Sequence, residues 1–193
     1  IEEIILSKKD IYSSAVHFGA LTCQPKNRCL NYNPKYENDR FCVQLKWYNL
    51  FDDIIKANLA QEIPQLGHYY DVVLHACGKA HMIPRTEDEK QAFYDVNYQG
   101  TVNLCKALEK VGVPKAFVFI STVAVYGCEF GDMITEDHPL NGDTPYAKSK
   151  IMAEEYLQKW CKDNNVVLGI LRPSLLAGKN APGNLGAMVN GVK

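Results

Sequence analysis

Three short apolar runs, each bounded by polar or turn-forming residues, stand out after residue 58 of the chain. They cover residues 71–76, 116–121 and 166–171. Apolar runs of this length are typical of strands that are buried on both faces of a parallel sheet. The pattern therefore predicts three buried strands.

Two longer segments between these runs carry apolar residues at helical spacing. The first covers residues 87–110 and ends near Gly112, and the second covers residues 145–164. Strands that alternate with helices predict an α/β fold, in which a parallel sheet has helices on both faces. Because ligands of such sheets bind beyond the carboxyl ends of the strands, we expect a site on that rim.

The first 57 residues follow neither pattern clearly. Residues 41–48 are compatible with a strand and residues 51–57 with a short helix, but the sequence from residue 12 to residue 48 shows no convincing helix or strand period. We therefore divide the chain into an atypical, unassigned segment at residues 1–57 and a partial α/β domain at residues 58–193.

Composition narrows the classes of function. The 193 residues carry a formal net charge of −1, which argues against nucleic acid or a membrane surface as a partner. No apolar run approaches the roughly 20 residues that cross a bilayer. The seven cysteines are scattered and never form a C-x-x-C pair, which favours a reducing, cytoplasmic location and argues against a metal site.

Tyr146 and Lys150 lie four residues apart at the start of the second predicted helix. That spacing puts both side chains on one face of the helix. A neighbouring ammonium lowers the pKa of a tyrosine, which is ordinarily about 10. A tyrosine tuned in this way can exchange a proton with a substrate hydroxyl while hydride leaves the carbon or returns to it.

Such a pair is also common by chance on solvated helix faces, so its context matters. Thr122 directly follows the strand predicted at residues 116–121, and one loop separates it from Tyr146. A hydroxyl donor, a tyrosine and a lysine on one rim form a complete proton-transfer arrangement. We therefore predict that Thr122, Tyr146 and Lys150 are catalytic.

Several motifs in order resemble those of the extended short-chain dehydrogenase/reductases, the group that contains the NAD-dependent sugar-nucleotide epimerases and dehydratases. The motifs are His75-Ala76-Cys77-Gly78, Asn97-x-x-Gly100-Thr101, the run at residues 121–127, Pro145-Tyr146-x-x-Ser149-Lys150 and Leu171-Arg172-Pro173. The resemblance covers about two-thirds of the chain. It implies a Rossmann-like, doubly wound parallel sheet and an enzyme that acts on a nucleotide-linked sugar.

The resemblance also implies a role for each matching residue. Tyr146 would be the acid/base, Lys150 would lower its pKa and bind the nicotinamide ribose, and Thr122 would hold the reacting sugar hydroxyl. The residues implied in cofactor binding are Ala76, Cys77, Gly78, Asn97, Tyr146, Lys150, Pro173 and Ser174. Asn184 and Leu185 resemble the loop that holds the diphosphate of the sugar nucleotide, although a plain Gly-Asn turn explains them equally well.

The sequence departs from the family pattern at its N-terminus. The first 66 residues contain one glycine, Gly19, so the glycine turn that receives a pyrophosphate at a helix N-terminus is not recognisable. Asn58-Leu59 still resembles the Asp-Leu that follows the third strand of the family. We expect a fragment or a rearranged chain, with a truncated C-terminal substrate domain and weak binding of NAD(H).

The cofactor and the partners follow from the resemblance. NAD is the expected cofactor, and NADP stays open because the strand that distinguishes the two is not recognisable. A nucleotide sugar is the expected substrate. Family members commonly pair the helices that carry Asn97 and Tyr146 with a second subunit, so a homodimer is one option.

Two functions are compatible with these observations. The first is an epimerase or a 4-ketoreductase of a nucleotide-linked sugar. A dehydratase is disfavoured because Val123 and Ala124, rather than an acidic pair, follow Thr122. The second is a cofactor-deficient binding or regulatory protein that keeps the fold. The identity of the sugar cannot be read from the sequence.

Overall fold

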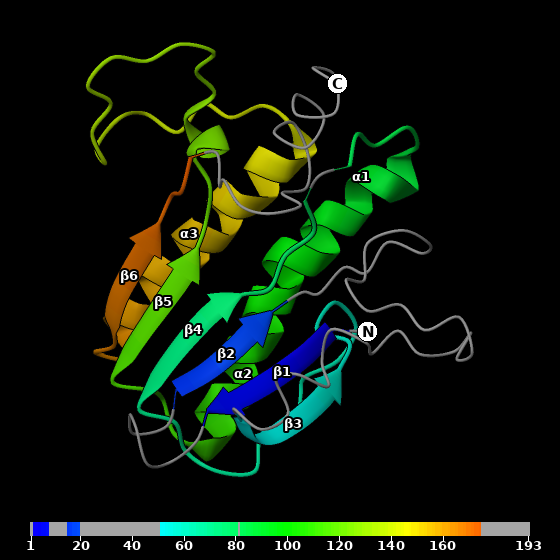
Figure 1. The fold of residues 1–193 in the computed structure, drawn as a ribbon, viewed down its shortest axis with the longest axis vertical. Coiled ribbons are helices and arrows are strands. Elements are labelled where there is room, and N and C mark those ends of the chain that lie inside the picture. The colour runs from blue at the N-terminus through cyan, green and yellow to red at the C-terminus, as the bar shows by residue number, and fades with distance from the viewer. Residues whose placement is uncertain (1, 8–14, 20–50, 81, 175–193) are drawn as a thin grey trace, which may run out of the picture.

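The computed structural model describes residues 2–7, 15–19, 51–80 and 82–174 (Figure 1). Among these residues, the strands join one sheet in the order β3-β1-β2-β4-β5-β6. The strands are β1 (Glu2–Ser7), β2 (Ala15–Gly19), β3 (Phe51–Ala57), β4 (Val72–Ala76), β5 (Ala116–Ile120) and β6 (Val167–Leu171). The parallel pairing of β4, β5 and β6 confirms the three strands predicted from the apolar runs.

The helices also lie where helical spacing predicts them. α1 (Glu87–Phe93), a π-helical stretch (Tyr94–Gln99) and α2 (Gly100–Val111) follow one another directly, and α3 is Pro145–Asp163. In Figure 1 these helices lie behind the sheet and cover one of its faces. The connection between β2 and β3 runs through residues 20–50, outside the described residues, so helices on the second face stay a prediction. None of the described helices is long and apolar enough to cross a bilayer.

The prediction of a short helix at residues 51–57 is wrong, because this segment is β3. Phe51, Ile54 and Ile55 have the i, i+3, i+4 spacing of a helix. The segment nevertheless pairs antiparallel with β1, so that Ile55 lies opposite Ile4. Backbone hydrogen bonds to a neighbouring strand decide the structure here, and a local pattern does not reveal that neighbour.

The unassigned N-terminal segment contributes further strands to the same sheet. β2 pairs in parallel with β4, and β1 lies between β2 and β3 and runs antiparallel to both. The strand predicted at residues 41–48 lies outside the described residues. The sheet therefore extends from the strands predicted by their apolar runs into residues 1–57.

The core lies between the sheet and helices α2 and α3. Its buried side chains include Leu104, Leu108, Phe117, Phe119, Leu157 and Trp160. The indole Nε1 of Trp160 donates a hydrogen bond to Glu109 Oε1 on α2 over 2.7 Å. Trp160 therefore joins α3 to α2 while it fills the core.

His75 is a buried polar residue of β4 within this core. Its ring centroid lies 5.4 Å from that of Phe119, and its Nε2 lies 2.9 Å from Thr101 Oγ1 on α2. Thr101 donates its one hydroxyl proton to the backbone oxygen of Asn97, so His75 Nε2 must donate to Thr101. Burial, followed by the charge of Lys150, lowers the pKa of His75 to about 3.

This low pKa predicts a pH dependence of stability. His75 stays neutral in the folded protein down to about pH 3, whereas a histidine in the unfolded chain titrates near 6.5. Between these values the unfolded state binds the additional proton, so the free energy of unfolding falls as the pH drops from about 6.5 towards 3. Urea unfolding at about pH 4.5 and about pH 7.5 should show a smaller loss for His75→Gln than for the wild type.

A matched control is His68→Gln, because His68 is exposed. This variant should lose as much unfolding free energy as the wild type over the same pH interval. An equal loss in His75→Gln and His68→Gln would contradict the prediction.

Candidate active site at the carboxyl ends of the strands

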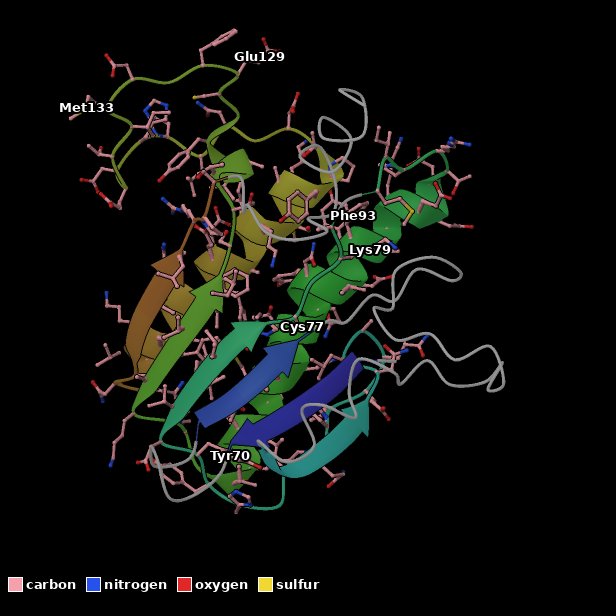
Figure 2. The ribbon with its side chains drawn as sticks, in the orientation of Figure 1. Tyr70, Cys77, Lys79, Phe93, Glu129 and Met133 are labelled. Carbon is pink, nitrogen blue, oxygen red and sulfur yellow. The ribbon has the colours of Figure 1, made fainter. Side chains whose placement is uncertain are left out.

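The residues predicted to form a site lie beyond the carboxyl ends of β4, β5 and β6. Residues 77–79 follow β4, Thr122 lies just past β5, and residues 172–174 follow β6. Figure 2 shows Cys77 and Lys79 along the path that leaves β4. Parallel strands end at one edge of the sheet, so residues from distant parts of the sequence reach the same rim.

The start of α3 places Tyr146 and Lys150. Thr144 caps the helix, because its Oγ1 accepts a hydrogen bond from the backbone N–H of Ala147 over 3.1 Å. Pro145 follows at the first helical position, where its missing N–H has no cost. Tyr146 therefore lies in the first turn, with Lys150 one turn later on the same face.

Thr122 lies close enough to Tyr146 to affect the pKa of the tyrosine. Burial raises the pKa of Tyr146 above its ordinary value, and the hydrogen bond with Thr122 partly opposes that rise. Thr122 Oγ1 also accepts a hydrogen bond from the backbone N–H of Ala124 over 3.2 Å. The tyrosine ring lies 6.2 Å from that of Phe93, centroid to centroid, so Phe93 supports it from α1.

Lys150 is almost fully buried at the end of β5. Its Nζ donates a hydrogen bond to the backbone oxygen of Ile120 over 3.0 Å and lies 4.6 Å from the centroid of the Phe119 ring. The charge of Lys150 contributes to lowering the pKa of His75. Its expected effect on the pKa of Tyr146 stays a prediction.

Gly78 lies where the chain passes closest to Lys150. A Cβ atom at this position would lie 2.9 Å from Lys150 Nζ and 3.0 Å from Asn97 Oδ1. Both separations are shorter than ordinary van der Waals contacts, so any larger residue would displace the lysine or the asparagine. Glycine at this point leaves both side chains in their observed positions.

Asn97 links the turn after β4 to the start of α3. Its Oδ1 accepts a hydrogen bond from the backbone N–H of Lys79 over 2.7 Å, and its Nδ2 donates to the Lys79 oxygen over 3.1 Å. Nδ2 also donates to Ser149 Oγ over 2.8 Å, and Ser149 in turn donates to the backbone oxygen of Tyr146 over 2.7 Å. These hydrogen bonds tie the turn after β4 to the first turn of α3.

Two buried polar residues of α3 were given no role by sequence reasoning. Ser149 and Glu154 both have 0% relative exposure. The sequence did offer one signal of their burial. Each is a polar residue at a helix position where the spacing of the apolar residues predicts an apolar side chain. The motif around Tyr146 contains Ser149, but its contact with Asn97 depends on a helix that lies far away in the sequence.

Of the remaining predicted cofactor and substrate residues, some lie at the strand ends and others lie outside the described residues. Ala76 is the last residue of β4, and the thiol of Cys77 is buried after it. The backbone oxygen of Pro173 accepts a hydrogen bond from Val123, and Ser174 is exposed. The predicted diphosphate loop at residues 184–185 lies outside the described residues. Within the described ranges no group of three or more His, Cys, Asp or Glu residues could hold a metal ion.

Curated proteins with similar sequences are sugar 4-epimerases by name. The N-acetyl-alpha-D-glucosaminyl-diphospho-ditrans,octacis-undecaprenol 4-epimerase of Escherichia coli is 42% identical over 95 residues, which is 48% of this chain and 28% of that protein. The UDP-glucose 4-epimerase of Bacillus subtilis is 39% identical over 101 residues, which is 52% of this chain and 30% of that protein. The matched part of the chain thus spans less than a third of the length of these relatives.

Solved structures share the fold. RMD from Pseudomonas aeruginosa, complexed with NADPH, has a TM-score of 0.51 and 27% identity and covers 62% of this chain and 41% of its own. The UDP-glucuronic acid 4-epimerase from Bacillus cereus, in complex with NAD, has a TM-score of 0.51 and 26% identity and covers 58% of this chain and 35% of its own. These similarities support the Rossmann-like parallel sheet expected from the sequence.

A family model matches most of the chain. The match runs over residues 31–191, and its description is the NAD dependent epimerase/dehydratase family. The motifs that suggested the resemblance lie within this range, as do the residues at the strand ends. The chain therefore belongs to the NAD-dependent epimerase/dehydratase family.

Proposed function

We propose that the protein is an NAD-dependent 4-epimerase of a nucleotide-linked sugar, with Tyr146 as its acid/base. The observation that carries the proposal is the placement of Tyr146 and Lys150 one turn apart at the start of α3, where Lys150 Nζ donates to the backbone oxygen of Ile120, two residues before Thr122. The names of the curated relatives favour epimerisation over the reduction of a keto sugar. A homodimer and a cytoplasmic location stay predictions.

The residues at the strand ends fit the nicotinamide end of a dinucleotide. Because Gly78 has no side chain, the backbone after β4 passes close to Lys150 Nζ and Asn97 Oδ1. Tyr146 and Lys150 offer a hydroxyl and an ammonium to the ribose. The other residues that would hold the cofactor are Ala76, Cys77, Pro173 and Ser174. NAD and NADPH each accompany a solved neighbour, so both forms are open.

The proton chemistry falls to Thr122 and Tyr146. A nicotinamide held by the residues named above would supply the transfer of hydride from the sugar carbon and back. Tyr146 Oη takes the proton of the sugar hydroxyl in one direction and gives it back in the other, while Thr122 holds that hydroxyl by a hydrogen bond. Burial raises the pKa of Tyr146, so the tyrosine needs a nearby cation to act as a base near neutral pH. Lys150 is the residue proposed for this role.

A second candidate function is a binding or regulatory protein that keeps the fold without turnover. It is favoured by one observation, the single glycine in the first 66 residues. Without a glycine turn, fewer backbone N–H groups can approach a pyrophosphate. Against it stands the arrangement of the half-buried Thr122 and Tyr146 with the buried Lys150, for which a binding module has no use.

Tyr146→Phe tests the acid/base role. The variant keeps the ring and its packing against Phe93 and removes the hydroxyl, so folding should be preserved. Turnover of UDP-glucose with saturating NAD should fall by about 10²–10⁴-fold, as for the loss of a general acid/base. Tyr156→Phe, on the same helix, is the matched control and should turn over like the wild type. Near-wild-type turnover in Tyr146→Phe would contradict the acid/base role of Tyr146.

Lys150→Met tests the role of the ammonium. The variant keeps the length of the side chain, and two effects are expected. Titration calorimetry at millimolar NAD should show weaker binding than in the wild type, whose own affinity is expected to be low. The pH optimum of turnover should move upward, because Tyr146 loses the cation that stabilises its phenolate.

Lys148→Met is the control for this second experiment, since Lys148 is exposed on the same turn of α3. It should leave both the affinity for NAD and the pH profile unchanged. An unchanged affinity and profile in Lys150→Met would remove the proposed role. Absence of NAD binding by the wild type would favour the binding-protein alternative.

A further inference from the structure

Glu154 is a fully buried carboxylate on α3, two helical turns after Tyr146. Arg172 neutralises it from the end of β6. Arg172 Nε lies 3.2 Å from each carboxylate oxygen, and its Nη2 lies 2.6 Å from Oε2. The side chain of Arg172 is itself only 13% exposed. Two charges have therefore been removed from water at a considerable cost of desolvation, for which their fork-like pairing compensates.

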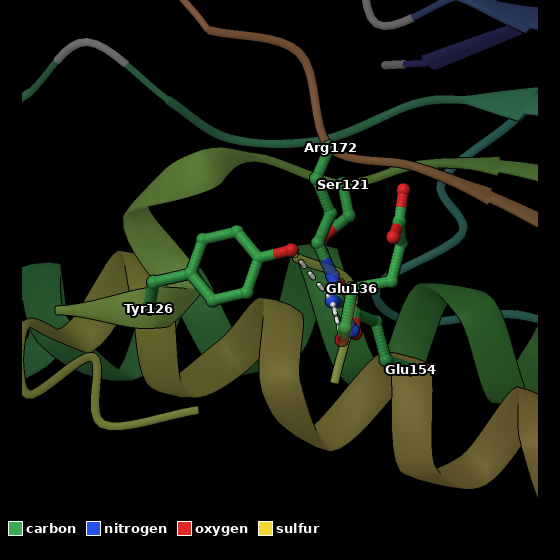
Figure 3. Close-up of polar contacts among 5 residues, drawn as sticks. All are labelled: Ser121, Tyr126, Glu136, Glu154 and Arg172. Carbon is green, nitrogen blue, oxygen red and sulfur yellow. Dashed lines mark hydrogen bonds and ion pairs between the residues drawn. The ribbon is translucent and has the colours of Figure 1, made fainter. Parts of the chain in front are cut away.

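The same guanidinium also holds the loop that leaves β5. Its Nη1 donates to the hydroxyl of Tyr126 over 2.9 Å and to the backbone oxygen of Glu136 over 3.0 Å. Figure 3 shows these contacts, with Arg172 between Tyr126 and Glu154. Arg172 thus ties together α3, the end of β6 and two points of the loop at residues 126–136.

Ser121 connects this ion pair to the proposed site. Its hydroxyl donates a hydrogen bond to Glu154 Oε1, and its backbone N–H donates to the Leu171 oxygen over 2.7 Å. Val123, two residues later, donates its N–H to the Pro173 oxygen over 3.3 Å. Thr122 lies between these two residues, so the backbone on both of its sides is held.

We propose that Glu154 is a positioning residue, which sets the position of the Thr122 hydroxyl against Tyr146 through Ser121. Tyr146 and Glu154 belong to one helix, and Thr122 and Ser121 are neighbours at the end of one strand. The Ser121–Glu154 hydrogen bond therefore constrains the distance between Thr122 and Tyr146. The catalytic consequence rests on the proposed function, whereas the effect of Thr122 on the pKa of Tyr146 can be measured without turnover.

Packing alone does not explain an ion pair at this place. Apolar residues of similar volume often stabilise a protein as well as a buried ion pair does. They would hold α3 against the sheet, but they could neither accept a hydrogen bond from Ser121 nor donate one to Tyr126. A double variant in which both charged residues are apolar therefore separates positioning from stability.

The experiment uses two variants. One is Glu154→Gln, and the other is a double variant that carries both Glu154→Met and Arg172→Met. The control is Glu155→Gln, because Glu155 is exposed beside Glu154. Three quantities are measured: the melting temperature, kcat and KM for UDP-glucose with NAD, and the titration of the tyrosine ¹³Cζ signals. Tyr146→Phe identifies the signal of Tyr146, and Thr122→Val shows the titration that follows loss of the hydrogen bond.

Glu154→Gln should lower kcat by about tenfold or more, with KM within about threefold, because misplacement of reacting groups costs rate rather than binding. The pKa of Tyr146 should rise as in Thr122→Val, since the hydrogen bond from Thr122 lowers it. The double variant should regain the melting temperature of the wild type and keep the low kcat and the raised pKa of Tyr146. Glu155→Gln should match the wild type in every measurement.

Two results would overturn the proposal. One is a double variant with the kcat and the Tyr146 pKa of the wild type, which would make the ion pair purely structural. The other is that neither value changes in Glu154→Gln or in Ser121→Ala, because Gln at position 154 can still accept the hydrogen bond from Ser121, whereas Ser121→Ala removes its donor and keeps the ion pair. If Glu154→Gln does not fold, Ser121→Ala decides alone, with the same expected changes. If Tyr146→Phe retains turnover, the proposed function fails, and the Tyr146 titration still decides whether Glu154 positions Thr122.

Discussion

The first two turns of α3 lie against the carboxyl ends of β4 and β5, and the rest of the site depends on this contact. Asn97 and Ser149 join the turn after β4 to the start of α3, and Lys150 donates a hydrogen bond to the last residue of β5. Hydrogen bonds of this kind are directional, so they define an angle and a distance that apolar packing leaves variable. The position of Tyr146 at the rim follows from them.

Three buried polar links hold the helices to the sheet and to one another. His75 on β4 meets Thr101 on α2, Asn97 of the π-helical stretch meets Ser149 on α3, and Glu154 on α3 meets Arg172 after β6. Burying each link costs free energy of desolvation. The link stabilises the fold only when its donors and acceptors are matched. The proposed catalytic pair lies between two of these links. A change in either one is expected to reach Tyr146 and Thr122 through rigid elements.

The π-helical stretch (Tyr94–Gln99) gives Asn97 its place. It lies between α1, which presents Phe93 to Tyr146, and α2, which presents Thr101 to His75. The wider turn of a π-helix shifts the faces of the flanking helices relative to each other. One continuous helical segment can thereby serve both the core and the site.

The sequence by itself determined much of this arrangement. Buried parallel strands are apolar throughout and amphipathic helices repeat about every 3.6 residues, so these elements were readable between residues 71 and 171. The candidate residues Thr122, Tyr146 and Lys150 were readable as well, because their positions at a strand end and a helix start are local features.

The tertiary structure alone decided that residues 51–57 form a strand, since that depends on pairing with β1. It also decided the partners of Glu154, because a charge on a helix is read as solvated until the fold brings Arg172 and Ser121 to it from other strands. Contacts between residues far apart in the chain leave no periodic trace in the sequence, and for this reason the buried ion pair was visible only in the folded protein.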